Sequence, residues 1–118
     1  MKSKAIIIEN DETWCFLYRQ HLKTVLDVVV IAEFERAEEA LKRIPQLCPD
    51  VVIADISLPG MSGLEFAQRM QEYPAVKIIL VTSHQQEYLS RYNQKGLLVL
   101  DKGDIKMLLG GLTKAIAK

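Results

Sequence analysis

The stretch that decides the fold is Asp-Val-Val-Ile-Ala-Asp-Ile-Ser-Leu-Pro-Gly-Met-Ser-Gly, residues 50–63. Its apolar run is rich in β-branched side chains and predicts a strand buried on both faces. The run ends at Asp55, whose carboxylate is costly to bury and should lie at the strand end, facing water or a cation. Pro59-Gly60 indicates a turn, and Ser62 to Glu65 the start of a helix. Ligands bind at the carboxyl ends of strands in open parallel sheets, so Asp55 is the first candidate for chemistry.

The size of the chain is typical of one domain. Its 118 residues, 49% hydrophobic and 25% charged, are ordinary for a globular protein, and no stretch reaches the ~18 apolar residues of a membrane span. Residues 5–8 are too short an apolar run for a secretory signal. We therefore expect one domain over residues 1–118, located in the cytoplasm and not in a membrane.

Charge and cysteine usage exclude other classes. Lysine plus arginine equals aspartate plus glutamate at 15 each, so the basic excess that nucleic-acid binding needs is missing, and we expect no direct contact with DNA or RNA. Cys15 and Cys48 lie far apart, without the spacing of a metal or redox motif. Both are predicted to be buried thiols.

Four further apolar runs predict strands over residues 4–8, 28–32, 76–81 and 97–100. Apolar side chains at steps of three and four predict helices over residues 13–26, 36–44, 64–70, 85–93 and 104–117. Asp11 or Asn10 can cap the first helix and Asp104 the last. Pro45 and Pro49 are expected in the loop that follows the second helix. Gly110-Gly111 should bend or fray the last one.

Strands that alternate with helices imply parallel crossovers, with helices on both faces of the sheet. We predict a doubly wound α/β fold with five strands in the flavodoxin-like order 2-1-3-4-5 and five helices. That order places several polar side chains at one edge of the sheet. They are Glu9, Asn10, Asp11, Asp55, Thr82 and Lys102.

These residue types suit phosphoryl chemistry. Carboxylate and carbonyl oxygens are the ligands that magnesium prefers. A lysine provides positive charge for phosphoryl oxygens, and a threonine can donate a hydrogen bond to the same group. A nucleophilic aspartate beside a cation is one known route to an acyl phosphate. The sequence shows no hydrolase triad or phosphate-binding glycine loop, and His21 and His84 are interpreted as packing or solvated side chains.

The chain resembles a response-regulator receiver domain of two-component signalling over all 118 residues. The resemblance is carried by Ile-Ile-Ile-Glu-Asn-Asp at 6–11, Asp-Ile-Ser-Leu-Pro-Gly-Met-Ser-Gly at 55–63, Val-Thr-Ser at 81–83 and Asp-Lys-Gly at 101–103. It implies that Asp55 is the phosphoacceptor, Thr82 the switch hydroxyl and Lys102 the phosphate contact. It also implies a Mg2+ ion bound by Glu9, Asn10, Asp55 and the backbone carbonyl of Ser57. Asp11 is a further candidate ligand, although a helix cap is its preferred role.

Three positions depart from the family pattern. Asn10 stands where the family usually has a second acid, Val99 where it has a switch aromatic residue, and Gly103 where proline commonly follows the lysine. These departures predict weaker magnesium binding, a different coupling to partners and a looser loop around Lys102.

Two functions from different classes follow. In the first, Asp55 takes a phosphoryl group from a histidine kinase or phosphotransfer protein in a Mg2+-dependent step, and the domain is a switch rather than an enzyme. In the second, a degenerate receiver binds proteins without phosphorylation. A nucleotide or flavin binder is disfavoured, because the acidic residues 9–12 would repel a phosphate. The expected output surface comprises the helix over 85–93 with Tyr88 and Tyr92, the strand over 97–100 and the last helix.

Overall fold

The structure is a computed structural model that describes residues 2–83 and 97–117. Its strands form one parallel sheet in the order β2-β1-β3-β4-β5, as predicted. The strands are β1 (Lys4–Ile8), β2 (Val29–Phe34), β3 (Val51–Asp55), β4 (Lys77–Thr82) and β5 (Leu98–Asp101).

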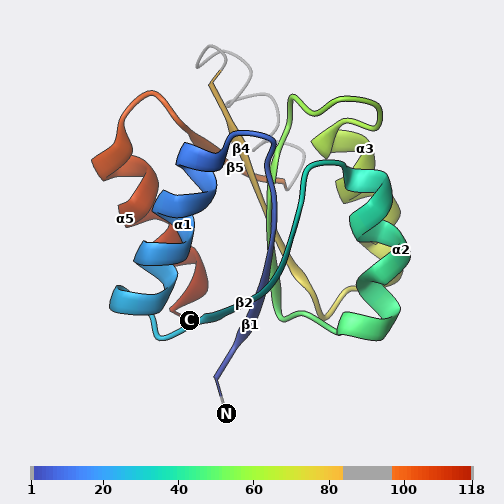
Figure 1. Ribbon diagram of the computed structural model, residues 1–118, viewed down its shortest axis with the longest axis horizontal. Coiled ribbons are helices and arrows are strands. Elements are labelled where there is room, and N and C mark those ends of the chain that lie inside the picture. Colours follow the sequence, from blue (N-terminus) through green and yellow to red (C-terminus); the bar gives the residue numbers. More distant parts are fainter. Residues whose placement is uncertain (1, 84–96, 118) are drawn as a thin grey trace.

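Helices cover both faces of this sheet (Figure 1). The described helices are α1 (Glu12–Val25), α2 (Ala37–Leu47), α3 (Gly63–Arg69), the short 3-10 turn η1 (Met70–Glu72) and α5 (Ile105–Ile116). Figure 1 shows α1 and α5 on one face and α2 and α3 on the other, the arrangement of a doubly wound fold. The helix predicted over residues 85–93, with Tyr88 and Tyr92, lies outside the described residues, as does His84. None of the helices in the described part is long and apolar enough to cross a membrane.

The core consists of two apolar layers separated by the sheet. Ile6 and Ile8 of β1 pack in the layer that contains α2 and α3, whereas Ala5 and Ile7 pack in the layer that contains α1 and α5. Successive side chains of a strand point to opposite faces, so a strand covered on both sides must be apolar at every position. This requirement explains why the strand segments read as nearly continuous apolar runs.

Side-chain caps begin three of the helices at the residues that the sequence indicated. The Asp11 carboxylate accepts a hydrogen bond from Thr13 N at 2.9 Å and caps α1. Ser62 and Asp104 cap α3 and α5 in the same way. Each cap satisfies an N–H group that has no partner inside its helix. The α1 cap also fixes the direction of the chain directly after β1.

Two details differ from the sequence predictions. Pro45 lies inside α2 rather than in the following loop. The helix tolerates it near the C-terminal end because the proline removes only one intrahelical hydrogen bond. Cys48 is exposed, not buried, since it is the left-handed C-cap residue of α2 with φ 48°. Cys15 is buried, as predicted. The α5 helix continues through Gly110 and Gly111 without a break.

Candidate functional site

The carboxyl ends of the strands bring the predicted polar residues to one edge of the sheet. Glu9 directly follows β1, Asp55 ends β3, Thr82 ends β4 and Lys102 directly follows β5. In the sheet register Ile8 pairs with Ala54, so the next residues, Glu9 and Asp55, are neighbours on adjacent strands. The strand order therefore assembles the site from four separate segments.

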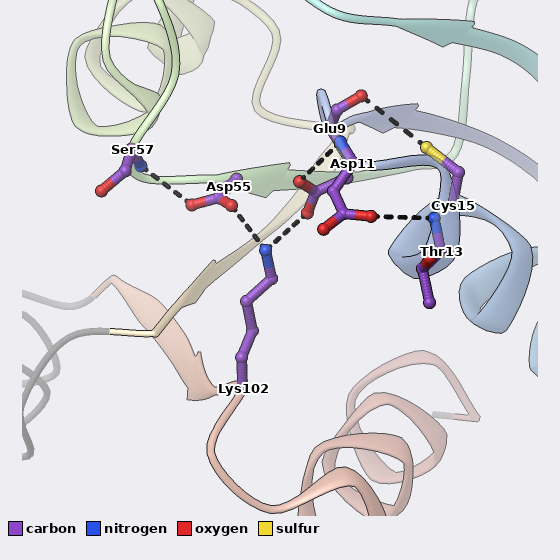
Figure 2. A network of polar contacts seen from close by, with 7 residues as sticks. All are labelled: Glu9, Asp11, Thr13, Cys15, Asp55, Ser57 and Lys102. Carbon is purple, nitrogen blue, oxygen red and sulfur yellow. Dashed lines mark hydrogen bonds and ion pairs between the residues drawn. The ribbon is translucent and has the colours of Figure 1, made fainter.

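Lys102 holds the two carboxylates together (Figure 2). Its Nζ donates hydrogen bonds to Glu9 Oε1 at 2.7 Å and to Asp55 Oδ2 at 2.6 Å. All three residues are buried, with exposed fractions of 3% for Glu9, 7% for Asp55 and 8% for Lys102. With both carboxylates ionised, two negative charges meet one positive charge, and the cluster retains an excess of negative charge.

Burial and these contacts together shift the pKa values of Glu9 and Lys102. Burial raises the pKa of the Glu9 carboxyl, and this effect exceeds the lowering by Lys102. Burial acts to lower the pKa of Lys102, but the hydrogen bonds to Asp55 and Glu9 outweigh it, so the pKa of Lys102 is raised. The lysine is consequently an ammonium at neutral pH.

The loop after β3 is fixed tightly around Asp55. Asp55 Oδ1 accepts a hydrogen bond from the backbone N of Ser57 at 2.9 Å. The first residue of α3, Gly63, donates from its backbone N to Ile56 O at 2.9 Å. A Cβ at position 63 would lie 2.3 Å from the carbonyl oxygen of Asp55, so only glycine permits this close approach. The glycine of the 55–63 motif is therefore required by backbone packing.

The remaining predicted residues differ in their placement. Thr82 is buried at the end of β4, and its carbonyl oxygen accepts a hydrogen bond from Lys102 N at 2.8 Å. Asn10 is exposed on the loop after Glu9. Asp11 is exposed too and uses Oδ1 for the helix cap, while its backbone N donates to Glu9 Oε2 at 3.3 Å. The structure thus brings Glu9, Asp55, Thr82 and Lys102 together, with Asn10 and Asp11 at the rim.

The oxygen atoms at this edge suit a magnesium ion. Oxygens of Glu9 and Asp55 converge on one cation, the ammonium of Lys102, which shows that both can face a single positive charge. Ser57 follows Asp55 in the same loop. Carboxylate and carbonyl oxygens with an excess of negative charge are the surroundings that Mg2+ prefers.

Sequence reasoning missed one residue of the site, Trp14. It was predicted only as part of the apolar stripe of the first helix, yet the centroid of its ring lies 5.0 Å from Lys102 Nζ. No local pattern signals a contact between residues so far apart in the sequence. His21, by contrast, has the packing role expected for it, since its Nε2 lies 2.8 Å from Thr113 Oγ1 between α1 and α5.

Cys15 lies beside the site, but its thiol is unreactive at neutral pH. Its Sγ donates to the backbone oxygen of Glu9 at 3.7 Å. Burial, together with the nearby acids Glu33, Glu12 and Glu9, raises the pKa of the thiol to about 11. A thiol with this pKa is not a nucleophile at neutral pH.

Comparison with known proteins identifies a single family. The family model of the response regulator receiver domain matches residues 5–100. The chain is 40% identical over 88 residues to the chemotaxis protein CheY of Listeria monocytogenes, a match that covers 71% of each chain. It is 36% identical over 80 residues to the response regulator GacA of Pseudomonas syringae pv. syringae, which covers 67% of this chain and 37% of that protein.

A solved structure agrees with this result. The signal receiver domain of a modulated diguanylate cyclase from Desulfovibrio desulfuricans G20 superposes with a TM-score of 0.79 and 28% identity, covering 99% of this chain and 95% of that one. Several curated relatives are much longer, and the matched parts amount to 23%, 37% and 37% of three of them.

Proposed function

Because the chain belongs to the response regulator receiver domain family, we propose that it is a signalling switch in which Asp55 accepts a phosphoryl group. Receiver domains interact with histidine kinases, and the donor proposed here is such a kinase or a phosphotransfer protein. The observation that carries the proposal is the 2.6 Å contact between Lys102 Nζ and Asp55 Oδ2 at a strand end. A nucleophile and a cation for the incoming phosphoryl group are thereby already in contact.

We propose that the domain extends over residues 1–118. The α5 helix lies beyond the matched residues 5–100, yet its Leu108 and Leu112 are buried in the same core layer as Ile7. The last helix is therefore part of the same packed unit.

The transfer step uses groups present in the chain. A carboxylate oxygen of Asp55 attacks the phosphorus of a phosphohistidine, a P–O bond forms, and the P–N bond breaks with its electron pair left on the imidazole nitrogen. The Lys102 ammonium neutralises charge on the phosphoryl oxygens, and the Thr82 hydroxyl donates a hydrogen bond to them. Hydrolysis of the acyl phosphate by water restores Asp55, so the domain is a switch and not a classical enzyme.

Magnesium fits this site through Glu9, Asp55 and the backbone carbonyl of Ser57. When bound, the ion would supply positive charge to the phosphoryl oxygens. Glu9 and Asp55 would hold the ion through their carboxylate oxygens, and Lys102 would contact the phosphoryl group. Asn10 contributes an amide in place of a second carboxylate and so reduces the attraction for the ion.

The alternative is a receiver that binds proteins without being phosphorylated. Two observations favour it: Asn10 replaces an acid, and position 99 holds a small buried Val99 in the core layer of α2 and α3 rather than an aromatic side chain. Against it, Asp55, Thr82 and Lys102 are all retained and adjacent. A site without phosphoryl chemistry has no physical need for all three.

Phosphorylation of Asp55 is the first prediction, and it separates the two functions. Incubation with a small phosphodonor such as acetyl phosphate should add one phosphoryl group to the intact protein, seen by mass spectrometry, faster with Mg2+ than without it. Asp55→Asn should remove this label, because an amide is a poor nucleophile.

The matched control is Asp50→Asn at the opposite end of the same strand. Asp50 is exposed, and its Oδ2 accepts a hydrogen bond from Lys4 N at 2.7 Å, far from the site. This variant should be labelled like the wild type. Full labelling of Asp55→Asn would overturn the assignment, and an unlabelled wild type would favour the phosphorylation-independent module.

A further inference from the structure

The ammonium of Lys102 has a third neighbour besides its two carboxylates. Trp14, in the first turns of α1, places its ring centroid 5.0 Å from Lys102 Nζ. A cation within ~6 Å of the centroid of an indole ring is attracted by the negative face of the ring, most strongly where water is excluded. Lys102 is 8% exposed, so this contact lies in a largely dry environment.

The indole ring is itself held in place. Tyr18, one turn further along α1, contacts Trp14 in a tilted arrangement, with ring centroids 5.8 Å apart and an interplanar angle of 32°. Tyr18 is fully buried in the core layer of α1 and α5, and Trp14 packs against that layer. The position of the indole is therefore set by the core rather than by the site.

The indole adds a third restraint on the Lys102 side chain, besides its two carboxylate contacts. Lysine has a flexible four-carbon stem and loses rotamer freedom when its ammonium is fixed. The residue after it, Gly103, does not stiffen the loop as a proline would. Phosphorylation of Asp55 would change one of the two carboxylate contacts of the ammonium, whereas the indole face would stay in place.

We propose that Trp14 is a positioning residue that keeps the Lys102 ammonium beside Asp55. This inference rests on the proposed phosphoryl transfer for its functional consequence. The contact itself does not depend on that transfer and can be tested in the unmodified protein.

The contact is tested by the NMR shifts of the Lys102 ε-methylene group in protein labelled at lysine. In the wild type the indole ring current should displace these proton shifts from those of the other lysines. Trp14→Leu should remove most of the displacement, and Trp14→Phe should keep part of it. Phe16→Leu is the matched control, because Phe16 is an exposed aromatic residue on the same helix, and this variant should leave the shifts unchanged. Unchanged shifts in Trp14→Leu would overturn the proposal.

The functional consequence is tested by rates of labelling with acetyl phosphate at saturating Mg2+. Trp14→Leu should slow labelling about fivefold to tenfold, as expected for losing a desolvated cation–π contact, and Trp14→Phe should recover part of the rate. In a Lys102→Met background, Trp14→Leu should have no further effect. Equal rates in the wild type and Trp14→Leu, or the same loss in both backgrounds, would show that Trp14 has a structural role only.

These outcomes distinguish this inference from the proposed function. A wild type that takes no label would refute phosphoryl transfer, and the NMR shifts would then decide by themselves whether the indole holds the ammonium. A labelled wild type with unchanged rate and shifts in Trp14→Leu would refute the role of Trp14 alone.

Discussion

At the scale of single residues, the site is governed by an imbalance of charge. Glu9 and Asp55 share the single ammonium of Lys102, at 2.7 and 2.6 Å. Buried carboxylates are costly unless they are paired, and removing the partner of a buried ion pair is strongly destabilising. The cluster is therefore stable at rest and still attracts a further cation.

Asn10 weakens the attraction for Mg2+ relative to the family pattern, because its amide replaces a carboxylate. A carboxylate about 4 Å from a divalent cation attracts it by roughly 2 kcal/mol even at the dielectric constant of water, and part of this is offset by desolvation and by repulsion between carboxylates. We predict that Asn10→Asp binds Mg2+ about tenfold more tightly, measured by calorimetric titration, and labels faster at sub-saturating metal.

The control for this prediction is Gln20→Glu, which adds the same charge on an exposed position of α1. Its magnesium affinity should equal that of the wild type. If Asn10→Asp also leaves the affinity unchanged, residue 10 does not face the metal, and Glu9 or Asp11 takes that place.

At the scale of elements, α5 shows how one glycine can be replaceable and its neighbour not. The helix contains Gly110 and Gly111 in its interior, where glycine costs about 1 kcal/mol relative to alanine. Within the described part of the chain, a Cβ at position 110 would meet no atom within 4 Å beyond its neighbours and the local helix backbone, whereas a Cβ at 111 would lie 2.9 Å from Leu100 Cδ2. Gly111 therefore allows α5 to pack closely on β5.

We predict that Gly110→Ala raises the free energy of unfolding by about 1 kcal/mol, because it removes backbone entropy from the unfolded chain. Gly111→Ala should gain less or lose stability, since the Leu100 side chain must move. Urea denaturation of the two variants measures the difference. An equal or larger gain for Gly111→Ala would contradict the packing described here.

At the scale of the whole molecule, the proposed signal starts where β4 and β5 end side by side. The backbone N of Lys102 donates to Thr82 O at 2.8 Å, so the ends of β4 and β5 are linked directly. Next to them, Val99, Asp104 and Met107 line a groove between β5 and α5, and Met107 is 75% exposed. Val99 cannot act as the aromatic switch residue of the family. We therefore propose that the structural change caused by phosphorylation passes through the segment after β4 to the surface of β5 and α5.

The corresponding prediction concerns amide NMR shifts with and without beryllium fluoride, a phosphoryl mimic, in the presence of Mg2+. Apart from direct effects on the residues that bind the metal or the mimic, the largest shift changes should fall between Thr82 and Lys102. In the proposed mechanism both residues contact the phosphoryl mimic, and a backbone hydrogen bond joins them. Asp55→Asn should show none of these changes. Changes confined to residues 13–45 would contradict this route.

Much of this fold follows from local chemistry. The uninterrupted apolar runs at 5–8 and 51–54 indicate strands covered on both faces, and caps such as Asp11 begin helices at predictable residues. Alternation of strands and helices implies a parallel sheet, for which we assume the flavodoxin-like order, and parallel strands bring their carboxyl ends to one edge. For these reasons the sequence predicts that Glu9, Asp55 and Lys102 lie together at that edge.

Other features of the protein are decided only by the tertiary structure, because they depend on contacts between segments that are distant in the sequence. The exposure of Cys48 follows from the way α2 ends after Pro45, and the sharing of Lys102 by two carboxylates follows from the distances between strand ends. The face of Trp14 meets Lys102 because α1 and the loop after β5 lie on the same side of the sheet. Local periodicity assigns a side chain to a helix face, but which group it meets there is set by packing across the sheet.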